Sequence, residues 1–285
     1  MKKKSIVIKL KGGIGNQFFQ IAFGLKLSRI RGWELLFEDS FFSNDPYGHS
    51  SVLHAFPELK KLQFSHIIGD VKSVLIQEEK VNDVIKLFNP ETTISNDISI
   101  IYFDGYWQDK KYFDDIDVTF LKNGLSNFYI NSKIKTRLPA NESNFTSIHF
   151  RRKDYRHHGL CGDLYYIFSL QYFLQQRNNL NLLVFSDEPN ATNFLLQSWK
   201  LNYTFINSGC DLSDLYIMSM CKNHIIANST FSWWGSTLAG TNNVIYPDEW
   251  SKIHIPAKNL FNENWICISN SMEEAKPKLI NIKLQ

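Results

Sequence analysis

The sequence predicts an α/β protein made of two Rossmann-like domains, and three observations lead to that prediction. Apolar segments of strand length alternate with segments of helical length along much of the 285-residue chain. Repeated strand–helix units of this kind form parallel sheets with helices on both faces. A polar stretch at residues 136–146 lacks hydrophobic periodicity and indicates a linker. We therefore expect an N-terminal domain over residues 1–138 and a C-terminal domain over residues 145–285, facing a central cleft.

The N-terminal half opens with a strand–helix–strand unit. Residues 5–10 predict a strand and residues 34–39 a second strand. The intervening residues 15–32 predict a helix with one apolar face, formed by Phe18, Ile21, Ala22 and Leu25. Residues 45–97 are less regular and mix amphipathic pieces with loops.

In the C-terminal half the alternation is continuous. The expected strands cover residues 147–150, 181–187, 203–207, 224–228 and 243–247. The expected helices cover residues 163–177, 190–199, 211–221 and 230–240. This order predicts one parallel sheet with helices on both faces.

Composition excludes several classes of protein. The hydrophobic content of 44% and the aromatic content of 14% indicate a packed globular chain, and a net charge of +3 is too balanced for a non-specific nucleic-acid binder. No signal peptide and no apolar run of about 18 residues is present, so we expect a cytoplasmic protein with at most peripheral membrane contact. Without metal-ligand spacing, we expect free, mostly buried thiols at Cys161, Cys210, Cys221 and Cys267.

A glycine-rich segment, KGGIGNQFFQ at residues 11–20, joins the first strand to the first helix. Such a turn lets backbone N–H groups approach a phosphate while the helix N-terminus points at it. The ligand contacts expected here are Gly13, Gly15, Asn16 and Gln17, with the two amides facing the cleft. The alternative is an ordinary tight turn between a strand and a helix.

Two adjacent arginines follow the apolar run of IHFRRKDY, residues 148–155. Strand alternation places His149 and Arg151 on one side and Arg152 on the other. Ligands of open α/β sheets bind outside the carboxyl ends of strands, where an arginine can hold two phosphate oxygens at once. We therefore assign Arg151 to an anion and expect Arg152 to pair with a carboxylate, Asp154 being the nearest in sequence. A structural salt-bridge cluster is the alternative.

The segment VFSDEP closes the next strand with Ser186 and Asp187. A carboxylate at this position can accept hydrogen bonds from the N1–H and N2–H₂ edge of a guanine. The alternative is that Asp187 caps the following helix.

A fourth motif, IIANSTFSWWGSTLAG, begins where a strand leads into a helix. Hydroxyls and backbone N–H groups at such a point can form an anion site, which the helix dipole strengthens. Ser229 or Thr230 could instead simply cap the helix. We expect that Trp233 and Trp234, being adjacent, do not both face the core and that one lines a pocket. The polar residues of this motif are Asn228, Ser229, Thr230 and Ser232.

Together with GYWQDKKYF at residues 105–113, these motifs resemble the bacterial α-1,2-fucosyltransferases of glycosyltransferase family 11. They run from residue 12 to residue 235 in the order of the family, and the H-x-R-R-x-D element is shared with a wider fucosyltransferase superfamily. Asp109 stands where the family usually has serine. The resemblance implies a GT-B fold, GDP-β-L-fucose as donor, inversion at the anomeric carbon, no metal, and a β-galactoside acceptor in a surface glycan such as an O-antigen.

The chemistry of the residues agrees with this resemblance. A transferase that expels GDP must stabilise charge on the departing diphosphate, with a metal or with fixed cations. The D-x-D candidate, Asp115 and Asp117, lies in a charged stretch and is interpreted as solvated surface. We therefore expect Arg151 to contact the diphosphate, and we count it with Asn16 as catalytic. The predicted donor site comprises Gly13, Gly15, Asn16, Gln17, His149, Arg151, Arg152, Ser186, Asp187, Asn228, Ser229, Thr230, Ser232 and Trp233.

A single displacement also needs a group that receives the proton of the acceptor hydroxyl. Asp154 is the candidate nearest the arginine motif, although it could instead orient Arg151 or Arg152. His149 is expected to contact ribose or guanine, and its alternative is a satisfied strand histidine.

Two other functional classes stay open. A Rossmann-type oxidoreductase would use the glycine-rich turn and Asp39, but its fingerprint needs a glycine where Phe18 stands. It would also leave the arginine motif unexplained. A non-catalytic glycan-binding protein would explain the aromatic residues but not the paired anion sites.

Overall fold

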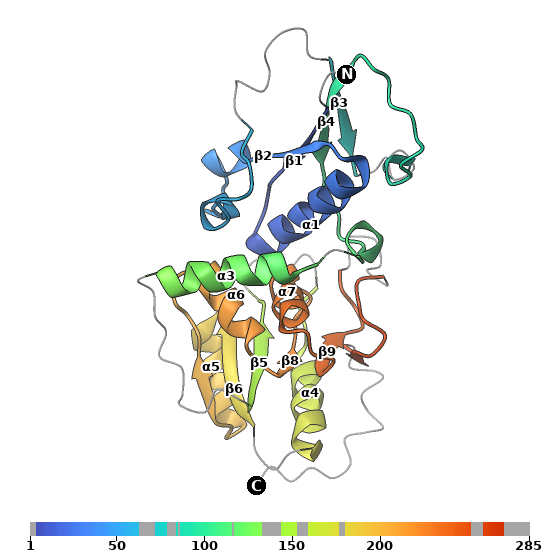
Figure 1. Ribbon diagram of the computed structural model, residues 1–285. Helices are drawn as coiled ribbons and strands as arrows, with labels where there is room; N and C mark the ends of the chain where they lie inside the picture. The colour runs from blue at the N-terminus through green and yellow to red at the C-terminus, as the bar shows by residue number, and fades with distance from the viewer. Residues whose placement is uncertain are drawn as a thin grey trace. The chain divides into compact units, whose positions relative to one another are not determined.

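A computed structural model describes residues 4–62, 72–78, 84, 86–115, 117–132, 144–152, 159–176, 180–251 and 259–270. The chain divides into two compact units, Met1–Gly124 and Leu125–Gln285, each with its own parallel sheet (Figure 1). The predicted α/β class is confirmed. The expected boundary between residues 138 and 145 stays a prediction, and most of the expected linker lies outside the described residues.

Unit 1 contains a four-stranded sheet. Its order is β2 (Glu34–Glu38), β1 (Ser5–Lys9), β4 (Ile98–Asp104) and β3 (Lys72–Gln77), and all three pairings are parallel. The strands at β1 and β2 and the helix α1 (Ile14–Arg31) were predicted. The two other strands were missed. Since β3 is an edge strand that exposes most of its residues, it has no buried, alternating face to read from the sequence.

Helix α1 is buried on more than the one predicted face. Leu25, expected in the core, is only partly buried, whereas Phe19 and Phe23 are completely buried. The helix approaches the sheet closely at Gly24, where an added Cβ would lie 2.8 Å from Cγ1 of Ile8. The close approach explains why a single amphipathic stripe underestimates the buried surface of this helix.

An aromatic cluster of Phe23, Phe103, Trp107 and Tyr112 fixes the chain that leaves β4. Phe23 stacks on Trp107 with ring centroids 4.3 Å apart and an interplanar angle of 9°. Phe103 and Tyr112 meet Phe23 edge-on, at 5.2 and 5.6 Å. Trp107 is fully buried with a positive φ of 57°, a backbone conformation that packing must hold in place.

Unit 2 contains a six-stranded sheet with helices on both faces (Figure 1). Its strand pairs are parallel, and the order is β10 (Ile266–Ile268), β9 (Val244–Pro247), β8 (Asn223–Ile225), β5 (Phe145–Phe150), β6 (Asn181–Ser186) and β7 (Tyr203–Phe205). The helices after these strands are α4 (Asp163–Gln176), α5 (Pro189–Ser198), α6 (Asp211–Ser219) and α7 (Thr230–Ala239). All nine elements predicted here are confirmed, whereas β10 was not predicted. Helix α3 (Thr119–Asn131), which begins in unit 1 and ends in unit 2, was not predicted either.

Residues of β5 alternate between the two faces of this sheet. Ile148 and Phe150 join the core formed with α4 and α5. Phe145 belongs to the opposite core with α6, and the ring of His149 lies 5.4 Å from that of Phe231 on α7. The alternation continues to the end of the strand and decides on which side of the sheet each of the following arginine side chains lies.

Two histidines of unit 2 are buried without charge. His224 is fully buried; its Nε2 lies 3.1 Å from the Cys221 carbonyl, and its Nδ1 accepts from the Ser147 hydroxyl at 2.7 Å. Because a carbonyl only accepts, Nε2 carries the hydrogen. Burial lowers the pKa of His224 to about 3. Burial, aided by the nearby charge of Arg151, lowers the pKa of His149 to about 3 as well.

We expect the stability of unit 2 to fall as the pH drops below the ordinary histidine pKa of about 6.5. Between that pH and about 3, the histidines are protonated in the unfolded chain but stay neutral in the folded protein. Each of the two therefore lowers the free energy of unfolding by at most about 1.4 kcal/mol per pH unit. Urea unfolding at pH 7.5, 6 and 5 measures the slope, which should be about half as steep in His224→Asn. His54→Gln, at an exposed position, is the control. A free energy of unfolding that is flat from pH 7 to 5 would contradict this account.

Candidate functional site

The topology of unit 2 indicates a ligand-binding position at the carboxyl ends of β8, β5 and β6. The chain moves from β5 to β6 and β7 on one side, then returns to β8 on the other side of β5. Ligands of doubly wound sheets bind at this switch point, beyond the carboxyl ends of the strands. The pairing of Phe150 with Ser186 and of Ile148 with Ile225 brings the residues after all three strands to one edge.

The two arginines after β5 lie on opposite sides, as predicted. Arg151 Nε is 3.4 Å from Asp187 Oδ2, and about a quarter of the Arg151 side chain (27%) is exposed. Arg152 turns toward α4, where it donates to Asp163 at 2.5 Å and lies over the ring of Phe150. Among the described residues, Asp163 is therefore the carboxylate partner of Arg152.

Asp154, the candidate proton acceptor and candidate arginine partner, lies outside the described residues. Its role stays a prediction.

Asp187 connects the two arginine positions. Its Oδ2 pairs with the Arg151 side chain, and its Oδ1 accepts from the backbone N–H of Arg152 at 2.9 Å. It is not the cap of α5, because that position is held by Glu188. The alternative of a helix cap is therefore wrong. Asp187 positions Arg151, and the predicted contact of Asp187 with a guanine stays a prediction.

Ser186 faces its own turn in the structure. Its hydroxyl accepts from the backbone N–H of Glu188 at 3.0 Å and lies 2.8 Å from the hydroxyl of Thr192. These bonds hold the start of α5, and the donor contact expected of Ser186 stays a prediction.

His149 ends β5 with a buried ring. The residue is 5% exposed, and Nδ1 has no hydrogen-bond partner within the described part of the chain. The alternative of a satisfied strand histidine does not fit this environment. A pKa of about 3, caused by burial and by Arg151, keeps the ring neutral and makes it a poor base. The ring can instead exchange a hydrogen bond with a polar ligand.

Helix α7 begins without a side-chain cap. Ser229 is the N-cap residue, but its hydroxyl makes no capping bond, so the alternative of a simple cap is wrong for Ser229. The neighbouring polar side chains turn inward. Asn228 donates to the Gly159 carbonyl at 2.8 Å, and the fully buried Ser232 hydroxyl lies 3.3 Å from the Ser229 carbonyl. Asn228 and Ser232 therefore brace the turn at the start of α7.

The expectation that Trp233 and Trp234 do not both face the core is wrong. Their relative exposures are 3% and 0%, and their rings lie nearly perpendicular, 5.1 Å apart. Both are buried because α7 is covered on more than one side. A Cβ on Gly235 would lie 2.4 Å from Sδ of Met218 on α6, while Trp233 Nε1 donates to the Leu260 carbonyl at 3.2 Å.

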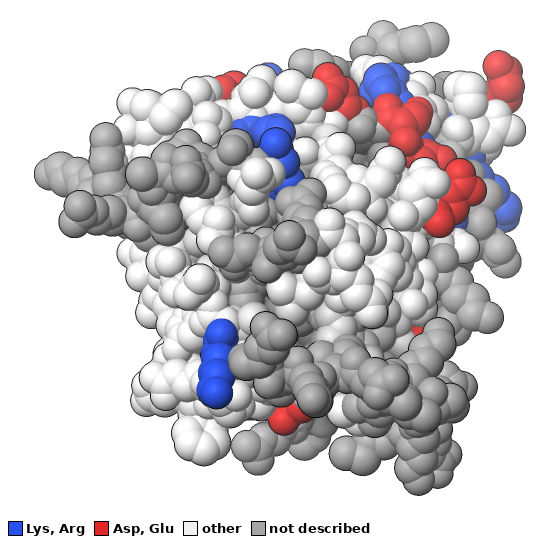
Figure 2. All heavy atoms as spheres, turned by 90° about the horizontal axis from the view of Figure 1, so that it is seen from below, with Lys and Arg blue, Asp and Glu red and all other residues white. Residues whose placement is uncertain are grey.

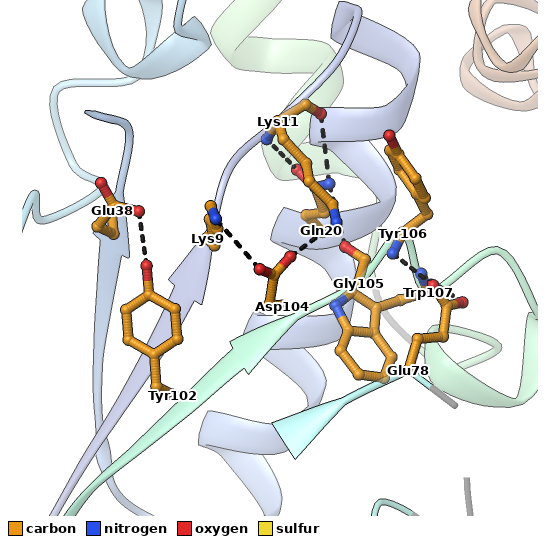
Figure 3. A network of polar contacts seen from close by, with 10 residues as sticks. All are labelled: Lys9, Lys11, Gln20, Glu38, Glu78, Tyr102, Asp104, Gly105, Tyr106 and Trp107. Carbon is orange, nitrogen blue, oxygen red and sulfur yellow. Dashed lines mark hydrogen bonds and ion pairs between the residues drawn. The ribbon is translucent and has the colours of Figure 1, made fainter. Parts of the chain in front are cut away.

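Unit 1 has its own switch point, where β1 lies between β2 and β4. Figure 3 shows the polar network at these strand ends: Lys9 and Lys11 both pair with Asp104, at 3.1 and 2.7 Å. The ammonium of Lys11 also lies 4.6 Å from the ring centre of Tyr106. Glu78 accepts from the backbone N–H groups of Tyr106 and Trp107, which fixes an aromatic ring that is 38% exposed.

The two amides of the glycine-rich turn have different environments. Asn16 is partly exposed and accepts from Gln108 Nε2 at 3.0 Å. Gln17 is fully buried: its Nε2 donates to the carbonyls of Gly12 and Ser50, and its Oε1 accepts from the backbone of Val52. Gln17 thus anchors the loop around residue 50 and does not present its amide to a ligand.

The rest of this turn argues against a dinucleotide fingerprint. Gly13 is the N-cap of α1, and Gly15 is buried inside the helix. Phe18 occupies the third-glycine position and is fully buried. Asp39, the candidate ribose ligand, pairs with Lys61 at 2.7 Å.

Asp45 and His49 were missed from the sequence. Their side chains meet at 2.6 Å. The signal was present as an i, i+4 spacing in DPYGH, but no sequence pattern showed that the loop returns to the glycine-rich turn.

The D-x-D candidate belongs to the surface. Asp115 pairs with Lys26 and Arg29, and Asp117 accepts from the backbone of Thr119 at the start of α3. Among the described residues, no three His, Cys, Asp or Glu side chains gather as metal ligands would. The solvated-surface interpretation of Asp115 and Asp117 agrees with their exposure.

The predicted free thiols can be compared with the structure. Of the four free thiols, two are buried, one is half-buried and Cys267 is exposed, so they are less uniformly buried than expected.

On the face shown in Figure 2, described acidic and basic side chains lie close together near one edge. Within the described residues, no helix has the length and apolar character needed to span a bilayer.

The profile of Glycosyl transferase family 11 matches residues 76–269, more than half of the chain. The chain belongs to this glycosyltransferase family. An α-1,2-colitosyltransferase of Escherichia coli is 30% identical over 266 residues, covering 82% of this chain and 87% of the relative. The O-antigen biosynthesis glycosyltransferase WbnK of Escherichia coli is 27% identical over 297 residues, covering 90% and 98%.

Solved structures confirm the GT-B fold. NodZ, an α-1,6-fucosyltransferase from Bradyrhizobium soaked with GDP-fucose, aligns with a TM-score of 0.53 at 11% identity, covering 88% of this chain and 97% of its own. An arginine-to-lysine variant of Arabidopsis thaliana FUT1 in complex with GDP aligns with a TM-score of 0.50 at 13% identity, covering 84% and 69%. The family assignment favours a transferase over the oxidoreductase and the non-catalytic glycan-binding protein.

Proposed function

We propose that the protein transfers L-fucose from GDP-β-L-fucose to the 2-hydroxyl of a β-galactoside in a surface glycan of the O-antigen type. The observation that carries the proposal is the partly exposed Arg151 at the switch point of unit 2, held by Asp187 beside the neutral His149. A cation fixed at this edge suits a ligand that carries a diphosphate. The relatives named for O-antigen biosynthesis and for α-1,2 transfer support the acceptor class and the linkage.

The reaction that we propose is a single inverting displacement without metal. The acceptor oxygen attacks the anomeric carbon from the face opposite GDP, so a β-linked donor yields an α-fucoside. Arg151 and the N-terminus of α7 stabilise the charge that grows on the diphosphate. His149 contacts the nucleoside, and Asn16 stays a predicted donor contact of unit 1.

A colitose donor is a second candidate, because the relative at 30% identity is named a colitosyltransferase. Colitose is L-fucose without its 3-hydroxyl, so GDP-colitose would present the same diphosphate and the same anomeric centre to Arg151. The two candidates differ only in what surrounds carbon 3 of the sugar. Cytoplasmic location at the inner face of the membrane would suit either donor.

Transfer assays with GDP-fucose and GDP-colitose against a panel of β-galactosides, all in excess EDTA, test the proposal. We expect an α-1,2 product, identified by NMR, and a rate that EDTA leaves unchanged. Loss of turnover in EDTA that Mn²⁺ restores would overturn the metal-free mechanism and return attention to Asp115 and Asp117. Thermal-shift measurements with GDP, NAD and free glycans complete the test, since stabilisation by NAD alone would contradict a transferase.

A further inference from the structure

The loop after β2 carries a histidine–aspartate pair that the donor site leaves unused. His49 Nδ1 lies 2.6 Å from Asp45 Oδ2, and the same oxygen accepts from the His49 backbone N–H at 2.7 Å. The backbone N–H of Tyr47 donates to the other oxygen at 3.4 Å. The Asp45 side chain is completely shielded from solvent, whereas 24% of the His49 side chain is exposed.

This geometry decides which ring nitrogen of His49 can react. Burial alone would raise the pKa of Asp45, but hydrogen bonds from His49 and Tyr47 lower it overall, so the carboxylate is ionised near neutral pH. A carboxylate only accepts, so in the neutral imidazole Nδ1 carries the hydrogen and Nε2 keeps its lone pair. No described residue donates to Nε2.

The reactive edge of His49 lies beside the glycine-rich turn. A Cβ built on Gly13 would lie 3.6 Å from Nε2 of His49. A Cβ on the neighbouring Gly12 would lie 3.5 Å from Cε1 of Tyr106, the exposed ring at the end of β4. Nε2 of His49 and the partly exposed ring of Tyr106 thus flank two consecutive glycines at the switch point of unit 1.

The position of His49 is held by the core of the unit. Gln17, fully buried on the first turn of α1, bonds to the Ser50 carbonyl at 3.0 Å and to the Val52 N–H at 2.9 Å. The chain directly after His49 is therefore tied to the turn that His49 borders. Preorganisation of this kind is what a proton-transfer residue requires.

We propose that His49, oriented by Asp45, is the general base that removes the proton of the acceptor hydroxyl. The role rests on the proposed transferase function, and it gives to His49 the task considered for Asp154. The Nε2 lone pair takes the hydroxyl proton while the acceptor oxygen forms its bond to the anomeric carbon. The bond from that carbon to the β-phosphate oxygen breaks, and its electron pair leaves with GDP. The Asp45 carboxylate stabilises the imidazolium.

Initial rates with GDP-fucose, GDP-colitose and the β-galactoside panel, measured from pH 5 to 9, test the assignment in wild type, His49→Gln, Asp45→Asn and His54→Gln. His54 lies five residues further along, in the short 3-10 helix Val52–Ala55, and is exposed, which makes His54→Gln the matched control. We expect His49→Gln to lower kcat by about 10²- to 10⁴-fold with GDP affinity unchanged. Asp45→Asn should lose roughly 10-fold or more, and His54→Gln should match wild type.

The pH profile separates a base from a structural residue. In wild type, kcat should fall on the acid side, where a protonated imidazole accepts no proton, and this limb should vanish in His49→Gln. A His49→Gln protein that binds GDP and keeps kcat within about threefold of wild type would overturn the assignment. If His49→Gln does not fold, an Asp45→Asn protein with an unchanged rate and profile overturns it equally. A wild type that transfers neither sugar would instead overturn the proposed function.

Discussion

Arg151→Ala should weaken GDP binding by about 1.5–3 kcal/mol and slow the chemical step by a further 10²-fold or more. The guanidinium sits at the carboxyl end of β5, where its Nε is 3.4 Å from the Asp187 carboxylate. A diphosphate there gains charge as its bond to the sugar breaks, so the same cation serves binding and the transition state. Lysine at this position should recover little, because a point charge does not span two phosphate oxygens as the guanidinium fork does.

Calorimetric titration with GDP beside initial rates decides this prediction. Arg29→Ala is the matched control, because Arg29 is half exposed (52%) and pairs with Asp115 on the surface of unit 1. Arg29→Ala should leave the GDP affinity and the initial rate near those of wild type. A folded Arg151→Ala protein that binds GDP and turns over normally would show that the arginine motif receives no phosphate.

Phe23→Ala should lower the free energy of unfolding by about 3–5 kcal/mol, the usual cost of emptying a phenylalanine site in a packed core. Phe23 is fully buried and contacts Phe103, Trp107 and Tyr112. The loss should also reach function. Trp107 is held in its left-handed conformation by this packing, and it directly precedes Gln108, the partner of Asn16.

Chemical denaturation followed by tryptophan fluorescence measures this effect. Phe194→Ala removes the same ring from a position that is 78% exposed, so its free energy of unfolding should change by no more than about 0.5 kcal/mol. If the two variants lose similar stability, the aromatic cluster does not hold unit 1 together in the way described.

The sequence by itself determined the strand–helix order of unit 2 and the faces of its central strand. Alternation along β5 was enough to place His149 and Arg152 on opposite sides, and the contacts with Phe231 on α7 and Asp163 on α4 agree with this. The period-2 pattern of strands and the period-3.6 pattern of helices are local. They can therefore be recognised in the sequence without knowing which elements pack against each other. The order of the motifs also sufficed to indicate the family that the profile match then confirmed.

Only the tertiary structure decided which polar residues face outward. Gln17, Ser186, Asn228 and Ser232 all lie in ligand-like motifs, yet their side chains satisfy nearby or distant backbone groups. Two of the partners of Gln17 are 33 and 35 residues away, and the carbonyl that accepts from Asn228 is 69 residues away. A pattern gives the direction of a side chain but not the element that covers it.

The same limit explains the tryptophans and the histidine–aspartate pair. One helix has two sides, and the expectation for Trp233 and Trp234 assumed that only one of them was covered. His49, which lies beyond the end of β2, approaches the start of α1, because a Cβ built on Gly13 would lie 3.6 Å from His49 Nε2. The bond from the Val52 N–H to Gln17 holds the loop between them. Burial and partner choice are properties of packing between elements, and packing is not encoded in the periodicity of any single element.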